Sequence, residues 1–259
     1  MDCRIGFVTQ MGMSHETVFE VAADHGFDFV EVMMDGADER TRLAARSDEF
    51  RSSLTTHDLD LLVHLPFGGV DLGSPFEHVR AGSVRELAAA VDTAATLGAE
   101  KAVVHPTTGA WSPAWDARGL RENVVDSLRT LDEHASEAGV ELCAENVPRS
   151  VFRTHEFSEL LRETDVSMTL DTGHARMDGR DSAGIAAFAE RFGDRIGHLH
   201  LNDTRQAKDE HLPFGAGDID FPAVFDALGD DWTGTLSLEV FTHDVDYLGV
   251  SKRRLAALL

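Results

Sequence analysis

The sequence predicts a single (β/α)8 TIM barrel that spans residues 1–259 as one domain. Short apolar runs alternate with longer amphipathic stretches along the whole chain, and this alternation is typical of βα units around a parallel sheet. Eight strand candidates in 259 residues match the size and the strand count of such a barrel. A doubly wound open sheet is the alternative, but no G-x-G-x-x-G fingerprint follows the first strand candidate.

The elements follow one another in a regular order. The strand candidates, rich in Val, Leu, Ile and Phe, span residues 3–8, 26–33, 59–65, 101–105, 139–145, 166–171, 196–201 and 234–240. Clear helix candidates span 85–98 and 121–139, and each ends at a glycine that suits a helix C-terminus. Because no linker rich in proline or serine interrupts this rhythm, we expect one domain.

The charge balance restricts the class of protein. The chain carries 46 acidic and 23 basic side chains, a formal net charge of −23. Such a surface repels itself until salt screens it, so we expect a cytoplasmic protein of a high-salt-adapted organism. The charge argues against a nucleic-acid partner, because DNA binding relies on Lys and Arg. We expect no membrane span and no signal peptide, and Cys3 and Cys143 fit a reducing compartment.

Seven of the eight strand candidates end on a carboxylate or an imidazole. Active sites of such barrels gather at the C-terminal ends of the strands, so these side chains should converge at one mouth. Burying several carboxylates together without a cation would destabilise the fold. The strand-end residues therefore predict that a divalent metal lies at this mouth; they are Glu31, His64, His105, Glu145, Asp171, His200 and Glu239.

Two spacings add candidates at the same rim. Asp171 and His174 lie three residues apart where a strand turns into a helix, and Asp209 and His211 lie two apart in an extended loop. The second pair is also consistent with a solvated acidic loop. Mixed imidazole and carboxylate ligands favour Zn, Mn, Co or Fe over Ca or Mg.

Several motifs are more specific than the rhythm of elements. They are VHLPF at 63–67, VVHPT at 103–107, CAENVP at 143–148, LDTGHA at 170–175, HLHLND at 198–203, DEHLPFGAGDIDF at 209–221 and SLEV at 237–240. Together they resemble the xylose-isomerase-like barrel superfamily, which contains sugar isomerases and epimerases, inosose dehydratases and endonuclease IV. Barrels of this kind often pair, so a homodimer is an expectation that the resemblance carries.

The resemblance to the sugar-epimerase branch implies an enzyme with one divalent ion. It implies that Glu145, Asp171, His200 and Glu239 hold the ion. It also implies that the two glutamates act as an acid/base pair, through an enediolate of a sugar or sugar phosphate. The further substrate-binding candidates are Glu31, His174, Arg205 and Trp111.

The resemblance to endonuclease IV implies a different enzyme, a phosphodiesterase with up to three zinc ions. Every one of the nine ligand positions of that branch has a matching residue type here. These are His64, His105, Glu145, Asp171, His174, His200, Asp209, His211 and Glu239.

Three observations favour the isomerase or epimerase reading over the nuclease. The opening strand lacks the histidine and the Gly-Gly pattern typical of endonuclease IV. Glu31 is a feature of the sugar-binding branch, and Phe67 is followed by Gly68, which leaves an incomplete wedge for a base stack. A third hypothesis, a barrel that binds a sugar or metal without turnover, has no need of paired carboxylates on a metal.

Overall fold

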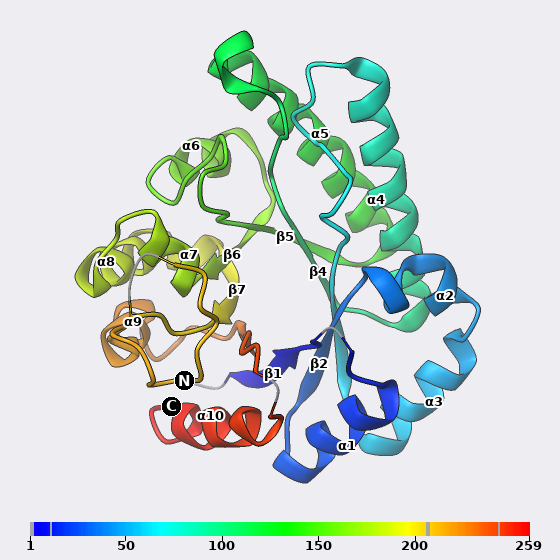
Figure 1. Ribbon diagram of the computed structural model, residues 1–259, viewed down its shortest axis with the longest axis vertical. Coiled ribbons are helices and arrows are strands. Elements are labelled where there is room, and N and C mark those ends of the chain that lie inside the picture. The colour runs from blue at the N-terminus through cyan, green and yellow to red at the C-terminus, as the bar shows by residue number, and fades with distance from the viewer. Residues whose placement is uncertain (1–2, 11, 206–207, 243) are drawn as a thin grey trace.

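Eight parallel strands close into a barrel in the order of the sequence, with β1 paired to β8. A computed structural model describes residues 3–10, 12–205, 208–242 and 244–259. The strands are β1 (Arg4–Val8), β2 (Phe29–Met33), β3 (Asp60–His64), β4 (Lys101–Val104), β5 (Glu141–Glu145), β6 (Ser167–Asp171), β7 (Ile196–Leu201) and β8 (Thr235–Leu238). Figure 1 shows the helices arranged around these strands, which confirms the predicted (β/α)8 barrel.

Helices follow the strands on the outside of the barrel. They are α1 (His15–His25), α2 (Arg40–Ala44), α3 (Ser47–His57), α4 (Glu77–Leu97), α5 (Ala117–Ala138), α6 (Phe157–Glu163), α7 (Thr172–Met177), α8 (Ser182–Phe192), α9 (Phe221–Leu228) and α10 (Asp246–Ala256), with 3-10 turns η1 (Gly36–Asp38), η2 (Ser112–Ala114) and η3 (Gly193–Arg195).

The two helices expected from the sequence are confirmed at their C-terminal ends. Gly98 and Gly139 follow α4 and α5 in the left-handed conformation, where glycine is favoured. Each helix begins before its predicted start: α4 begins at Glu77 and not at residue 85, and α5 begins at Ala117 and not at residue 121. No helix in the described part of the chain combines the length and apolarity needed to span a membrane.

The register of the strands sets the depth of each inward-facing side chain. Met33 pairs with His64 at the ends of β2 and β3, whereas Glu31 pairs with Leu62, two residues deeper. A side chain at position 31 therefore lies one layer below the histidine that ends β3. Glu31 and His64 therefore lie at different depths in the barrel, although the sequence places both near the end of a strand.

Candidate metal centre

Polar side chains converge at the C-terminal ends of the strands, as the sequence predicts. Glu145 and Asp171 are the last residues of β5 and β6, and His200 is the fifth residue of β7. His105 and Glu239 directly follow β4 and β8, because these two strands end one or two residues earlier than the sequence suggests. Except for His105, which is partly exposed, these side chains are buried.

Glu145 lies at the centre of the cluster. Its Oε2 atom is 3.1 Å from Nε2 of His105, 3.4 Å from Nε2 of His64 and 3.5 Å from Nδ1 of His200. Its Oε1 atom is 2.8 Å from Nδ1 of His174. One carboxylate thus contacts four imidazoles, which suits a ligand shared between neighbouring cations.

Asn202 connects the carboxylates of Asp171 and Glu239. Its Nδ2 group donates to Oδ2 of Asp171 at 2.8 Å and to Oε2 of Glu239 at 3.3 Å. This position requires a glycine at residue 173, because a Cβ atom there would lie 1.8 Å from Oδ1 of Asn202. The glycine of the LDTGHA motif therefore lets an amide hold two carboxylates in place.

The loop after β7 brings two further predicted residues to the mouth. Backbone hydrogen bonds of 3.1 and 2.9 Å join Asp203 to Leu212 and fold the loop back on itself. Oδ1 of Asp209 then lies 2.8 Å from Nε2 of His211 and 3.8 Å from Nε2 of His174. The Asp209 and His211 pair therefore contacts His174 at the mouth, although the side chain of Asp209 is 45% exposed.

The structure brings all nine predicted metal-binding residues into one contiguous cluster. Each has a ligating atom within 3.7 Å of a ligating atom of another member. Within it, two groups of three have donor atoms close enough to share a cation: His64, His105 and Glu145, and Glu145, Asp171 and His200.

The two glutamates differ in protonation. Burial raises the pKa of Glu145, but the facing His105 and His200 outweigh it and hold the pKa well below its usual value. Burial, together with the neighbouring Asp171 and Glu145, outweighs His200 and His211 and raises the pKa of Glu239 to about 8. The pKa of His200 lies well above its usual value, because three carboxylates outweigh its burial.

The residues fit a divalent cation. Nδ1 of His200 is buried without a hydrogen-bond partner among the described residues. Two ligands about 2.1 Å from a tetrahedral ion are roughly 3.4 Å apart. The separations from Nδ1 of His200 to the carboxylates of Glu145 and Glu239 are 3.5 and 3.6 Å.

The structure corrects the expected role of Glu31. Its side chain is 0% exposed and accepts hydrogen bonds from His198 and His200 beneath the cluster. Both of its carboxylate oxygens are engaged inside the barrel, below the side chains that face the mouth. The sequence places Glu31 near a strand end, but the register of β2 against β3 places it one layer deeper.

Two other substrate-binding candidates lie at the surface. The guanidinium of Arg205 donates to Glu210 at 2.9 Å, and its side chain is 65% exposed. Trp111 is 73% exposed where the loop after β4 enters η2. Their contact with substrate stays a prediction.

Two phenylalanines lie beside imidazoles of the cluster, although neither is among the substrate-binding candidates expected from the sequence. The ring of Phe67 lies 4.8 Å from the ring of His105, and the ring of Phe241 stacks on His211 at 4.4 Å. Both are partly exposed. Their sequence neighbours could have indicated this location, since Phe67 belongs to the VHLPF motif and Phe241 follows Glu239 by two residues.

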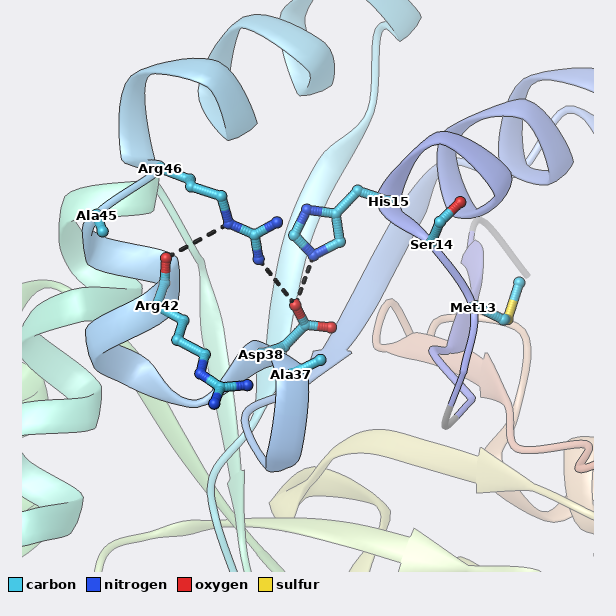
Figure 2. A pocket seen from close by; sticks show the side chains of 8 residues that line it. All are labelled: Met13, Ser14, His15, Ala37, Asp38, Arg42, Ala45 and Arg46. Atoms are coloured by element: carbon cyan, nitrogen blue, oxygen red, sulfur yellow. Dashed lines mark hydrogen bonds and ion pairs between the residues drawn. The ribbon is translucent and has the colours of Figure 1, made fainter.

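A groove lies beside the mouth, between the loops that follow β1 and β2. One part, of about 490 Å³, is lined by Met13, His15, Arg42 and Arg46 among others. Figure 2 shows Asp38 between His15 and Arg46, which it contacts at 2.6 and 3.4 Å. A second part, of about 440 Å³, shares Met13 and reaches Met33, the partner of His64 in the sheet.

Comparisons with known proteins agree with this architecture. A family model described as xylose isomerase-like TIM barrel matches residues 19–258. A D-tagatose 3-epimerase-like protein of solved structure superimposes with a TM-score of 0.86 at 25% identity, over 98% of this chain and 96% of that one.

Two relatives match by sequence. A putative L-ribulose-5-phosphate 3-epimerase of Escherichia coli is 26% identical over 86% of this chain and 82% of its own. A probable endonuclease 4 of Halobacterium salinarum is 31% identical over 58% of this chain and 59% of its own. The relatives therefore include both enzyme classes that the nine residues suggest.

Proposed function

Since the chain belongs to the xylose isomerase-like TIM barrel family, we propose that it is a divalent-metal-dependent epimerase or isomerase of a sugar or sugar phosphate. The similarity to epimerases over nearly the whole chain supports this class. The observation that carries the proposal is the placement of Glu145 and Glu239 beside the same atom, Nδ1 of His200, at the mouth.

Glu145, Asp171, His200 and Glu239 would hold the cation that this reaction needs. The ion, which is Zn, Mn or Co on the chemistry of these donors, would polarise the carbonyl of a bound ketose and acidify the adjacent C–H bond. Asn202 keeps two of the carboxylates turned toward the site through its hydrogen bonds.

The two glutamates exchange the proton. One carboxylate removes the proton from the carbon next to the carbonyl, which leaves an enediolate of the substrate, and the other returns a proton to the opposite face. Glu145 comes from β5 and Glu239 follows β8, so the two side chains enter the mouth from different parts of its wall. His174, at 2.8 Å from Glu145, orients a substrate hydroxyl.

Solvent exchange tests this proposal. The protein, loaded with metal, is incubated in deuterated water with a panel of ketoses and ketose phosphates. We expect one deuterium at the carbon next to the carbonyl, in the product and in recovered substrate. A metal-loaded protein that incorporates no deuterium into any member of the panel contradicts the epimerase proposal.

A second candidate function, a zinc-dependent phosphoester hydrolase, rests on a specific observation. His64, His105, Asp209 and His211 exceed what a single-ion epimerase requires, yet all four contact the cluster. A site with three ions would activate a water and clamp a phosphate. Phosphodiesters, phosphorylated small molecules and abasic DNA are the substrates that test this function.

Two features make DNA the less favoured substrate of such a hydrolase. The net charge of −23 repels a polyanion, since binding relies on basic side chains. Beside the mouth, Phe67 is followed by two glycines, Gly68 and Gly69, which offer no second wedge for a base stack. Hydrolysis of abasic DNA by the zinc-loaded protein would nevertheless decide for the hydrolase.

A further inference from the structure

Glu31 is the one carboxylate among the predicted site residues that lies beneath the cluster, inside the barrel. It is the central residue of β2, and its side chain is 0% exposed. An unpaired carboxylate at such a depth would be strongly destabilising. Its contacts should therefore explain why the barrel tolerates it.

Three donors surround the Glu31 carboxylate. Nε2 of His200 lies 2.9 Å from Oε1, and Nε2 of His198 lies 3.0 Å from Oε2. The hydroxyl of Ser237 donates to Oε2 as well. His198 is held in turn by Thr235, whose Oγ1 lies 2.7 Å from Nδ1 of the ring.

These contacts determine how His200 faces the metal centre. An ionised carboxylate only accepts hydrogen bonds, so Nε2 of His200 must carry a proton toward Glu31. The opposite ring nitrogen, Nδ1, then points toward Glu145 and Glu239, where it would offer its lone pair to a cation in place of a proton. A carboxylate behind a ligating imidazole also makes that imidazole a stronger ligand.

The distances separate this arrangement from a second metal site. Glu31, His198 and His200 have donor atoms close enough together to suggest one. Their N to O separations of 2.9 and 3.0 Å, however, are those of hydrogen bonds. They are shorter than the roughly 3.4 Å expected for two ligands of one tetrahedral ion.

We propose that Glu31 is a positioning residue that fixes the proton of His200 on Nε2 and thereby strengthens divalent-cation binding at Glu145, Asp171, His200 and Glu239. His198 and Ser237 hold the Glu31 carboxylate in the orientation that this role requires. The inference rests on the metal site of the proposed function but not on its reaction.

The test compares zinc affinity in three variants, measured by competition with a chromogenic chelator. In Glu31→Gln the amide keeps one acceptor oxygen and loses the negative charge, so its NH2 group must face either His200 or the pair His198 and Ser237. We expect zinc to bind about 10 to 100 times more weakly than to the wild type. Ser237→Ala, which removes one donor to Glu31, should shift the affinity in the same direction by less.

Thr169→Val is the matched control. Thr169 is also fully buried in the barrel, and its hydroxyl has no hydrogen-bond partner among the described residues, so the nearly isosteric valine removes no contact. We expect the affinity of this variant to equal that of the wild type. Circular dichroism of each variant checks folding, and Ser237→Ala keeps the test decisive if Glu31→Gln does not fold.

A second readout separates positioning from general stability. In the zinc-loaded wild type we expect a strongly deshielded Nε2 proton of His200 in the NMR spectrum, and an upfield shift of this proton in Glu31→Gln. Unchanged zinc affinity in Glu31→Gln overturns the inference. So does the loss of one bound ion per chain with unchanged affinity for the rest, because Glu31 would then be a ligand itself.

Failure of the proposed function gives a different result. A wild type that binds zinc tightly but exchanges no substrate proton contradicts the epimerase proposal. The comparison of zinc affinities between wild type and Glu31→Gln is unaffected by that outcome.

Discussion

Glu145 and Glu239 lie beside the same ring atom, Nδ1 of His200, at 3.5 and 3.6 Å, although 94 residues separate them in the chain (239 − 145 = 94). The barrel creates this relationship, because β5 and β8 deliver both side chains to one mouth. A cation held by both glutamates would also bind the substrate, so both carboxylates would lie close to the same substrate carbon. The first two predictions follow from this geometry.

Glu239→Gln should abolish turnover while leaving the fold nearly intact. The amide cannot exchange a proton with the substrate, and loss of a positioned acid/base group reduces rates by roughly 10² to 10⁴. The rate of deuterium incorporation measures the effect. The control is Asp92→Asn, which removes an exposed carboxylate of α4 that pairs with His134 of α5. Retained activity in Glu239→Gln would refute the assignment of the active site.

Removal of metal should lower the thermal stability of the protein. Without a cation, the buried carboxylates of Glu145, Asp171 and Glu239 face one another with only partial compensation. A ligand at 1,000 times its Kd stabilises the folded state by about 4 kcal/mol, so chelation should lower Tm by roughly 10 °C. Elemental mass spectrometry of protein purified without chelator gives the number of ions: one supports the epimerase and three support the hydrolase.

Asp209→Asn should separate the two candidate functions. Asp209 contacts His174 and His211 but not the two glutamates, and its side chain is about half exposed. The epimerase mechanism does not use it, so deuterium incorporation should fall less than about fivefold. Phosphoester hydrolysis should fall by at least 10² if a third ion is needed at this position. A large loss of proton exchange would place Asp209 in the epimerase site.

We expect a substrate phosphate to bind in the groove of Figure 2. Arg42 and Arg46 lie on its wall, in a chain with twice as many acidic as basic side chains. Arg42→Ala should raise KM for a ketose phosphate about tenfold and leave KM for the free ketose unchanged, because only the phosphate gains charge-assisted hydrogen bonds. Equal KM changes for the two substrates would exclude this role.

Salt should stabilise the protein. The net charge of −23 produces self-repulsion, and the Debye length falls from about 10 Å at 0.1 M to about 3 Å at 1 M. The free energy of unfolding, measured by urea denaturation in KCl, should rise over this range. A free energy that is unchanged or lower at 1 M KCl would contradict an adaptation to high salt.

The sequence by itself determines the fold and the chemical type of the site. The alternation of short apolar runs with amphipathic stretches suffices for the barrel, because each βα unit buries its own apolar faces locally. The polar residues at or next to the ends of β3 to β8 suffice to predict which side-chain types could bind a metal, because the C-terminal ends of all the strands lie at the same mouth. His64, His105 and Glu145 could be named in this way before any contact was known.

Only the tertiary structure decides which of these polar residues face the mouth of the barrel. Glu31 and His64 lie on the neighbouring strands β2 and β3, but the register places Glu31 two residues deeper, where it accepts a hydrogen bond from His200. The path of the loop after β7 turns Arg205 toward Glu210 and Asp209 toward the cluster. Register and loop path depend on contacts between residues distant in the chain, and local sequence patterns do not encode such contacts.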